Sequence, residues 1–200
     1  QGGVEQLVQL IDEVPRHRHE SRRDPLHVVA GAAAAAEHRP VARIPEARVH
    51  VVRQGPQVAA NDLPAGMLAE TRIFHFGSLS FTDEPSRSAI LYAAETAKKA
   101  GAVISYDPNY RAPLWAGENE AAKEMRRGLE YADIVKLSGE ELRLLTGRSE
   151  PEAGAQVLLS QGIGTVLVTL GPKGCFCARR DGSVFLPTYD TAVRDTTGAG

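Results

Sequence analysis

The N-terminal third of this sequence contains none of the aromatic side chains on which protein cores usually depend. Residues 1–66 include no Phe, Trp, Tyr or Lys, whereas Arg is frequent and five of the six histidines of the 200-residue chain lie at or before His50. Aromatic side chains account for much of the area buried in most cores. We therefore predict that residues 1–66 form an atypical segment, either disordered or read off-frame from a GC-rich gene, and that residues 67–200 form a partial domain.

Further absences narrow the class of protein. No apolar run approaches the roughly 20 residues of a membrane helix, and the first residues lack the charged start and apolar stretch of a signal peptide. The net charge of -2 excludes a strongly basic chain, so neither nucleic acid nor membrane is expected as a partner. The two cysteines, Cys175 and Cys177, lack a metal or redox spacing and are expected to be buried or half-buried thiols in a reducing cytoplasm.

From Met67 onward the hydrophobic pattern alternates between the periods typical of strands and of helices. Strands are predicted over residues 72–76, 102–106, 134–137, 165–169, 176–179 and 183–187. Helices are predicted over residues 85–100, 118–131, 139–146 and 151–161, and Asp181-Gly182 is the predicted turn between the last two strands. This alternation predicts an α/β fold: a doubly wound, mostly parallel sheet flanked by helices, with ligands at the carboxyl ends of the strands.

Polar and turn-forming residues follow four of the predicted strands, at residues 75–79, 107–111, 136–141 and 169–174. A fifth segment, DTTGAG at residues 195–200, ends in small residues that let backbone N–H groups approach an anion. Its hydroxyl and carboxylate oxygens could bind a cation, although a plain tight turn also explains its glycines. Because the chain has neither a Walker A loop nor a GxGxxG fingerprint, these segments favour a phosphoryl site of another kind.

The segment DTTGAG resembles the second signature, DTxGAGD, of the ribokinase-like (PfkB) carbohydrate kinase family. The other segments follow in that family's order: HFGSLS, ISYDPNYRAPLW, ADIVKLSGEELRLLTG and VLVTLGPKG. The DPNYR and LW residues are more similar to fructokinases and 2-keto-3-deoxygluconate kinases than to ribokinases or adenosine kinases, and HFGSLS favours fructokinase. The resemblance covers about residues 67–200. It implies a ribokinase-like fold and phosphoryl transfer from ATP to a sugar hydroxyl, with fructose as the first candidate, Mg²⁺ as cofactor and K⁺ as a second ion. A 2-keto-3-deoxygluconate kinase and a non-catalytic nucleotide-binding module are the alternatives.

The resemblance also implies roles for individual residues. The anion hole would be formed by Gly198, Ala199 and Gly200, and a monovalent cation would be held by Asp195 and Thr197. Ser138 and Glu141 match the family's N-x-x-E motif, which organises Mg²⁺ and phosphate through water. The nucleotide-binding turn corresponds to Thr169, Gly171 and Gly174, and the substrate or phosphate loop to Asp107, Asn109 and Arg111.

Several of these residues have an ordinary structural explanation as well. Asp107 and Asn109 are common in turns. Glu140 and Glu141 fit the acidic first turn of a helix capped by Ser138, and Gly171 and Gly174 could be ordinary loop glycines. His75 is expected to be a packed strand-end residue, and Trp115 a core anchor.

Two departures from the family pattern affect the expected activity. The chain stops at Gly200, one residue before the family's catalytic Asp, and residues 1–66 contain neither the family's sugar-binding GG signature nor its lid. We therefore expect this chain to be inactive by itself. The sugar and the oligomeric state are left open, and a homodimer is expected only for an intact family member.

Overall fold

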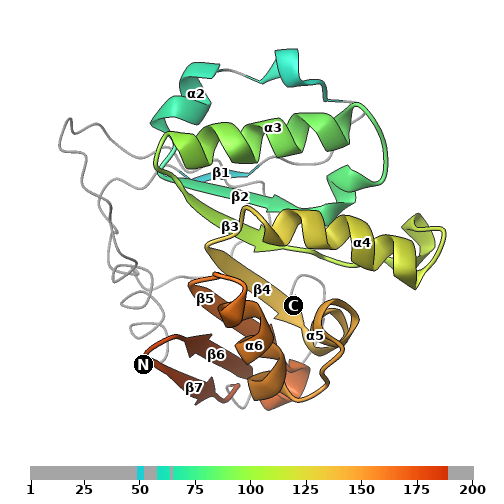
Figure 1. Ribbon diagram of the computed structural model, residues 1–200, viewed down its shortest axis with the longest axis vertical. Coiled ribbons are helices and arrows are strands. Elements are labelled where there is room, and N and C mark those ends of the chain that lie inside the picture. Colours follow the sequence, from blue (N-terminus) through green and yellow to red (C-terminus); the bar gives the residue numbers. More distant parts are fainter. Residues whose placement is uncertain (1–48, 52–57, 64, 189–200) are drawn as a thin grey trace, which may run out of the picture.

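The computed structural model describes residues 49–51, 58–63 and 65–188, which form one sheet of seven strands in the spatial order β1 to β7 (Figure 1). The strands are β1 (Val49–Val51), β2 (Ile73–Gly77), β3 (Val103–Asp107), β4 (Ile134–Ser138), β5 (Thr165–Thr169), β6 (Cys175–Arg179) and β7 (Gly182–Leu186). Strands β1 to β5 pair in parallel, and the β5–β6 and β6–β7 pairs are antiparallel. The predicted α/β class with a mostly parallel sheet is confirmed.

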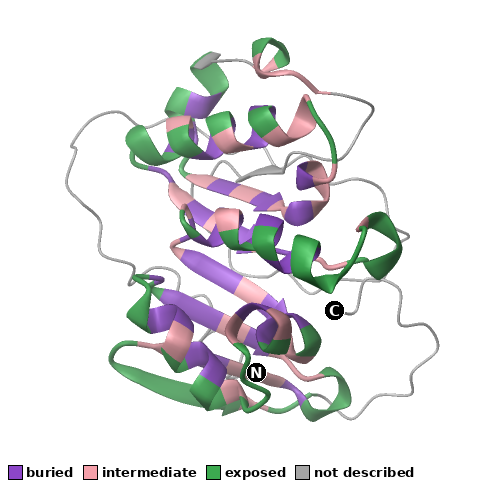
Figure 2. Cartoon of the chain, turned by 45° about the vertical axis from the view of Figure 1, so that its right-hand side comes forward, coloured by how far each residue is buried: buried purple, intermediate pink, exposed green. Residues whose placement is uncertain are grey.

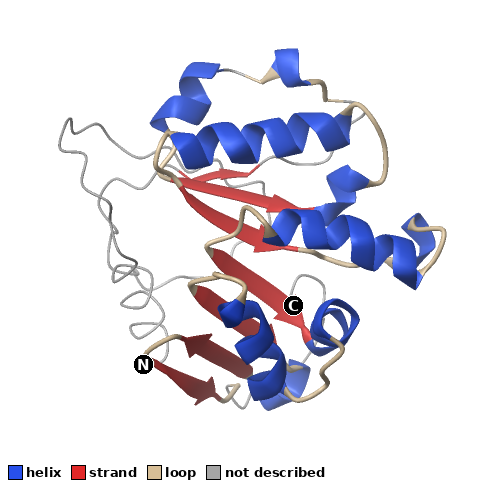
Figure 3. Ribbon diagram, in the orientation of Figure 1, coloured by secondary structure: helices blue, strands red, loops and turns tan. Residues whose placement is uncertain are grey.

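The main helices lie on one side of this sheet, in front of the strands in Figures 1 and 3. The helices are α2 (Ala65–Glu70), α3 (Ser86–Lys99), α4 (Glu118–Leu129), α5 (Gly139–Thr146) and α6 (Pro151–Ser160). Short 3-10 turns are η1 (Ala60–Asp62), η2 (Ser78–Phe81), η3 (Ala112–Leu114) and η4 (Gly171–Lys173). Helix α3 packs on β2 and β3, α5 on β4 and β5, and α6 on β5 and β6. Within the described ranges, no helix has the length and apolar character needed to cross a bilayer.

Alternation along the strands separates a buried face from a more polar one. Phe74 and Phe76 on β2, and Ile104 and Tyr106 on β3, are almost completely buried in the core. The residues between them, including His75, are only half-buried. Figure 2 shows burial concentrated in the central strands, whereas β7 is largely exposed. Because successive side chains of a strand point to opposite faces, the half-buried residues of the parallel strands share the face away from this core.

Three details differ from the sequence predictions, and the first is helix α2 (Ala65–Glu70), where no helix was predicted. The predicted turn at Asp181-Gly182 is wrong by one residue, because Arg179 pairs with Gly182 and this register makes Gly182 the first residue of β7. Strand β1, which the sequence did not predict, pairs with β2 and lies before residue 67. Its two valines have high strand propensity, but a run of three residues is too short to be recognised by periodicity. The division of the chain at residue 67 stays a prediction.

Candidate functional site

The carboxyl ends of β2 and β3 are joined through the backbone of residues 107–111, referred to below as the 107–111 loop. The carbonyl oxygen of Pro108 accepts hydrogen bonds from the backbone N–H of Ser78, at 3.1 Å, and from its hydroxyl. At Gly77 a Cβ atom would lie 3.0 Å from the carbonyl oxygen of Asp107, so glycine allows the two strand ends to approach closely. Asn109 has a left-handed φ of 51°, which Asn tolerates better than most residues. The loop is therefore a defined turn attached to its neighbouring strand.

A second set of contacts joins this loop to β4 and α5. The Oε1 atom of Glu141 accepts a hydrogen bond from the backbone N–H of Tyr110, and its Oε2 atom accepts one from Ser138, both at 2.6 Å. The Ser138 hydroxyl accepts in turn from the Glu141 N–H at 3.2 Å, which completes a capping box at the start of α5. The helix cap that the sequence allowed is thus present. Glu141 also has a long-range partner in the 107–111 loop.

The polar face of the sheet carries an ion pair directly beneath the loop. The Asp107 Oδ2 and Lys136 Nζ atoms are 2.9 Å apart, and Asp107 Oδ1 accepts the Asn109 N–H at 3.2 Å. On the neighbouring strands, the His75 Nδ1 and Ser105 Oγ atoms are 3.0 Å apart. Burial lowers the pKa of His75, with the positive charge of Lys136 acting in the same direction and the negative charge of Asp107 opposing it. Burial therefore favours the neutral imidazole.

Lys136 belongs to one of the predicted polar clusters, but sequence reasoning assigned it no role. A signal was present, because its lysine interrupts the otherwise apolar strand Ile134-Val135-Lys136-Leu137. Lysine is seldom buried without a partner, so a lysine in such a strand indicates a nearby carboxylate or an open sheet face. The structure identifies that carboxylate as Asp107.

The loop after β5 forms a tight turn against the hairpin. Gly171 and Gly174 have positive φ angles of 57° and 113°. At Gly174 a Cβ atom would lie 2.1 Å from the Leu186 carbonyl oxygen, so only glycine allows this approach of the backbone. The Thr169 hydroxyl donates to the Leu137 carbonyl oxygen at 3.2 Å, which ties the end of β5 to β4. These three residues form a rigid turn at the same sheet edge as Ser138.

The structure thus brings together part of the predicted set. Asp107, Asn109, Ser138 and Glu141 are linked by the hydrogen bonds above, whereas Arg111 is exposed and donates to the carbonyl oxygen of its chain neighbour Tyr110 at 3.2 Å. The remaining predicted site residues lie outside the described residues: Asp195, Thr197, Gly198, Ala199 and Gly200.

The residues with ordinary structural explanations behave largely as expected. Trp115 packs against the core, although its buried indole N–H has no hydrogen-bond partner. Cys175 is half-buried and Cys177 is buried, and neither forms a disulfide. Burial raises the pKa of both thiols, which keeps them in the less reactive protonated form.

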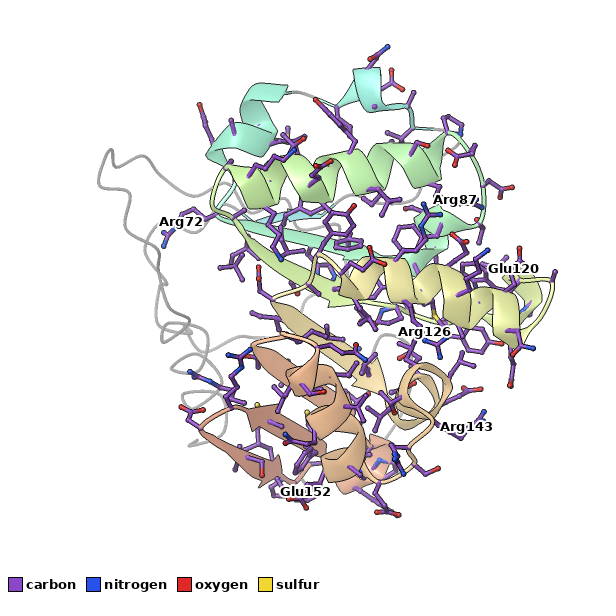
Figure 4. The ribbon with its side chains drawn as sticks, in the orientation of Figure 1. Arg72, Arg87, Glu120, Arg126, Arg143 and Glu152 are labelled. Atoms are coloured by element: carbon purple, nitrogen blue, oxygen red, sulfur yellow. The ribbon has the colours of Figure 1, made fainter. Side chains whose placement is uncertain are left out.

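Two arginines connect the helices that support the site. Arg126, labelled in Figure 4, extends from α4 and donates to the carbonyl oxygens of Leu144 and Leu145 at the end of α5. Arg87 on α3 donates to the Phe81 carbonyl oxygen at 2.7 Å and lies 3.7 Å from the Glu124 carboxylate. These side chains satisfy backbone oxygens at chain turns and fix α4 relative to its neighbours.

The described side chains do not by themselves provide a metal-binding cage. Across residues 58–63 and 65–188 no group of three or more His, Cys, Asp or Glu residues could hold a metal ion. Of the two acidic residues nearest the strand ends, Asp107 is paired with Lys136 and Glu141 accepts two backbone amides. Direct coordination of a divalent cation by these carboxylates does not fit the observed contacts.

An α/β sheet with polar loops gathered at the carboxyl ends of its parallel strands defines a class of small-ligand-binding domain. The chain belongs to the pfkB family of carbohydrate kinases, which matches residues 48–200. The match begins just before β1 and extends through the DTTGAG segment.

Individual relatives agree with this assignment. The chain is 42% identical over 140 residues to fructokinase-1 of Oryza sativa subsp. japonica, covering 70% of this chain and 43% of that protein. The fructokinase of Vibrio cholerae O395, crystallised with fructose, ADP and calcium, matches with a TM-score of 0.64 and 33% identity over 72% of this chain and 46% of its own. Aminoimidazole riboside kinase of Salmonella enterica matches with a TM-score of 0.62 and 31% identity over 72% of this chain and 48% of its own. The chain therefore spans less than half the length of these relatives.

Proposed function

We propose that this chain supplies the nucleotide-binding side of an ATP-dependent sugar kinase whose acceptor is fructose. The observation that carries the proposal is that Glu141 joins the 107–111 loop to the start of α5 by hydrogen bonds, in a chain of the pfkB family. The η4 turn follows β5, the neighbouring strand of the same sheet. The fructokinase relatives support fructose over other sugars. The solved fructokinase with fructose and ADP supports a sugar and a nucleotide as the small-molecule partners.

In the proposed reaction the residues of this chain bind and orient the nucleotide. Thr169, Gly171 and Gly174 would contact the nucleotide through the backbone at and around the η4 turn, and the space at the Gly171 Cβ position is open within 4 Å. Arg111, which is exposed at the rim, would contact phosphate or substrate oxygens through its guanidinium group. Phosphoryl transfer depends chiefly on such positioning and on stabilisation of negative charge.

The remaining roles concern anions and cations. The backbone N–H groups of Gly198, Ala199 and Gly200 would stabilise the transferred phosphoryl group, and Asp195 and Thr197 would help to hold K⁺. Mg²⁺ in kinases neutralises the charge of the nucleotide phosphates. Because the described carboxylates do not fit direct coordination, any contact of Glu141 with that ion would be through water.

A pair of glycine variants tests the nucleotide-binding turn. Gly171 and Gly162 both have positive φ, and at both positions an added Cβ atom would have no neighbour within 4 Å, but Gly162 lies before β5 at the opposite end of that strand. Valine strains such a backbone by about 1–3 kcal/mol at either position. In a titration with Mg-ATP followed by NMR, Gly171→Val should weaken binding roughly tenfold, whereas Gly162→Val should change it by less than about twofold. Equal affinities in both variants would reject the η4 turn as part of the site.

A further inference from the structure

Each carboxylate oxygen of Glu141 accepts a hydrogen bond from a backbone amide. Only 6% of the residue is exposed. One oxygen accepts the N–H of Tyr110 and the other accepts the N–H of Ser138, both at 2.6 Å. Hydrogen bonds from amides to a charged acceptor are stronger than those between neutral groups. In the sequence Glu141 lies 31 residues after Tyr110 and three residues after Ser138.

Each of three consecutive residues in the 107–111 loop is held by a different neighbour. Ser78 binds the carbonyl oxygen of Pro108, Asp107 binds the N–H of Asn109, and Glu141 binds the N–H of Tyr110. Of these contacts, the one from Glu141 attaches the loop to the first turn of α5. Arg111 is the last residue of this loop, so the loop backbone determines the direction in which its side chain leaves the sheet edge.

We propose that Glu141 is a positioning residue, which holds the 107–111 loop against the start of α5 by accepting one loop amide and one helix-cap amide. This assignment differs from a role as a metal ligand. A carboxylate with both oxygens bound to amides, in a residue that is 6% exposed, has little access to a hydrated ion. The assignment rests on the geometry of the described residues, and only its consequence for Arg111 depends on the proposed kinase function.

The substitution Glu141→Gln tests the role of Glu141 as a positioning residue. Glu141→Gln keeps the size of the side chain but replaces one acceptor oxygen with an NH₂ donor, so only one of the two amides retains an acceptor. Tyr110 lies outside the strands and helices, and the protection of its amide therefore depends on Glu141. Glu140→Gln is the matched control, because Glu140 is the exposed neighbouring carboxylate in the same helical turn.

Hydrogen exchange of the 200-residue chain, measured by NMR without nucleotide, provides the readout. In Glu141→Gln the amide that faces the new NH₂ group, either Tyr110 or Ser138, should exchange roughly tenfold faster, whereas both amides should stay within about twofold of wild type in Glu140→Gln. Unchanged protection of both Tyr110 and Ser138 in a folded Glu141→Gln variant would overturn the proposal, as would equal acceleration in the two variants.

A measurement on the unmodified chain covers the case in which Glu141→Gln does not fold. A scalar coupling across the hydrogen bond from the Tyr110 amide nitrogen to the side-chain carboxyl carbon of Glu141 is expected, and its absence would overturn the proposal. A titration of the unmodified chain with MgCl₂ alone adds a second criterion. Magnesium-induced shifts centred on the Glu141 carboxyl carbon, with loss of Tyr110 protection, would show a metal ligand instead. Neither result depends on nucleotide binding, so failure of the proposed kinase function would be seen separately.

Discussion

Replacement of Gly128 by alanine tests how closely α4 packs on the strand that leads into the candidate site. Gly128 faces Tyr106, whose fully buried ring also packs on Phe76 with ring centroids 4.7 Å apart. The Tyr106 hydroxyl donates to the Met125 carbonyl oxygen at 3.0 Å. A Cβ atom at position 128 would lie 2.4, 2.6 and 2.8 Å from three atoms of the Tyr106 ring. Since the ring is enclosed on both sides, either it or the helix must move.

Two opposing contributions determine the size of the effect. Alanine is favoured over glycine in a helix by about 1 kcal/mol. Overpacking of a filled core costs about 1–3 kcal/mol, and three contacts below 3.0 Å place Gly128→Ala toward the upper end of that range. We therefore expect a net loss of about 1–2 kcal/mol in the free energy of unfolding. Because Asp107 follows Tyr106 directly, the 107–111 loop should be displaced as well.

Urea denaturation followed by circular dichroism measures this free energy. Gly66→Ala in α2 is the control, because no atom lies within 4 Å of its Cβ position and only the helix-propensity contribution, up to about 1 kcal/mol in favour of folding, should remain. The two substitutions are therefore expected to have opposite signs. A Gly128→Ala variant as stable as wild type, or more stable, would refute the expectation that the close contacts with the Tyr106 ring cost more than the gain in helix propensity.

Two further outcomes follow from the polar contacts of the sheet. Burial lowers the pKa of His75 in the folded chain below its ordinary value of 6.5. Below pH 6.5 the unfolded chain therefore binds more protons than the folded chain. The contribution of His75 to stability is full above that pH and is lost as the pH falls below it. His75→Gln should reduce this loss in urea denaturations across that range, and an unchanged pH profile would contradict the assignment. Asp133→Ala removes the carboxylate that accepts the Ile104 N–H at 2.8 Å and should cost about 1.5 kcal/mol or more. Lys98→Ala removes the exposed partner of the 3.5 Å Lys98–Asp133 ion pair and should reduce stability less than Asp133→Ala in the same assay. The reverse order would show that the hydrogen bond from the Ile104 N–H to Asp133 is not the main contribution.

Most strands and helices of residues 67–188 could be predicted because their signals are local, and helix α2 is the exception. The continuous apolar run Val166-Leu167-Val168 in β5, and the buried stripe of α3 followed by Lys98 and Lys99, each identify an element without reference to the rest of the chain. The sequence could not show that β1 joins the sheet, because three residues carry too little periodicity. It also misplaced the hairpin turn, since the pairing register of β6 and β7 determines where that turn lies.

The candidate site divides in the same way. The residues at the carboxyl ends of the strands could be identified from the sequence, because polar and glycine-rich segments follow apolar runs there. Their partners could not. Tyr110 and Glu141 are 31 residues apart, and Asp107 and Lys136 are 29 apart, so neither pair leaves a local pattern.

Local composition and periodicity thus specify which segments become strands, helices and turns, and motif order identifies the family. Parallel pairing of β2, β3 and β4 is what places Ser78, the 107–111 loop and Glu141 within hydrogen-bonding distance. A carboxylate in the first turn of a helix is compatible with a simple cap, a metal ligand or a bridge to another loop. The choice among these roles depends on which backbone amides the fold places around its oxygens, because buried amides and carboxylates must satisfy one another when water is excluded.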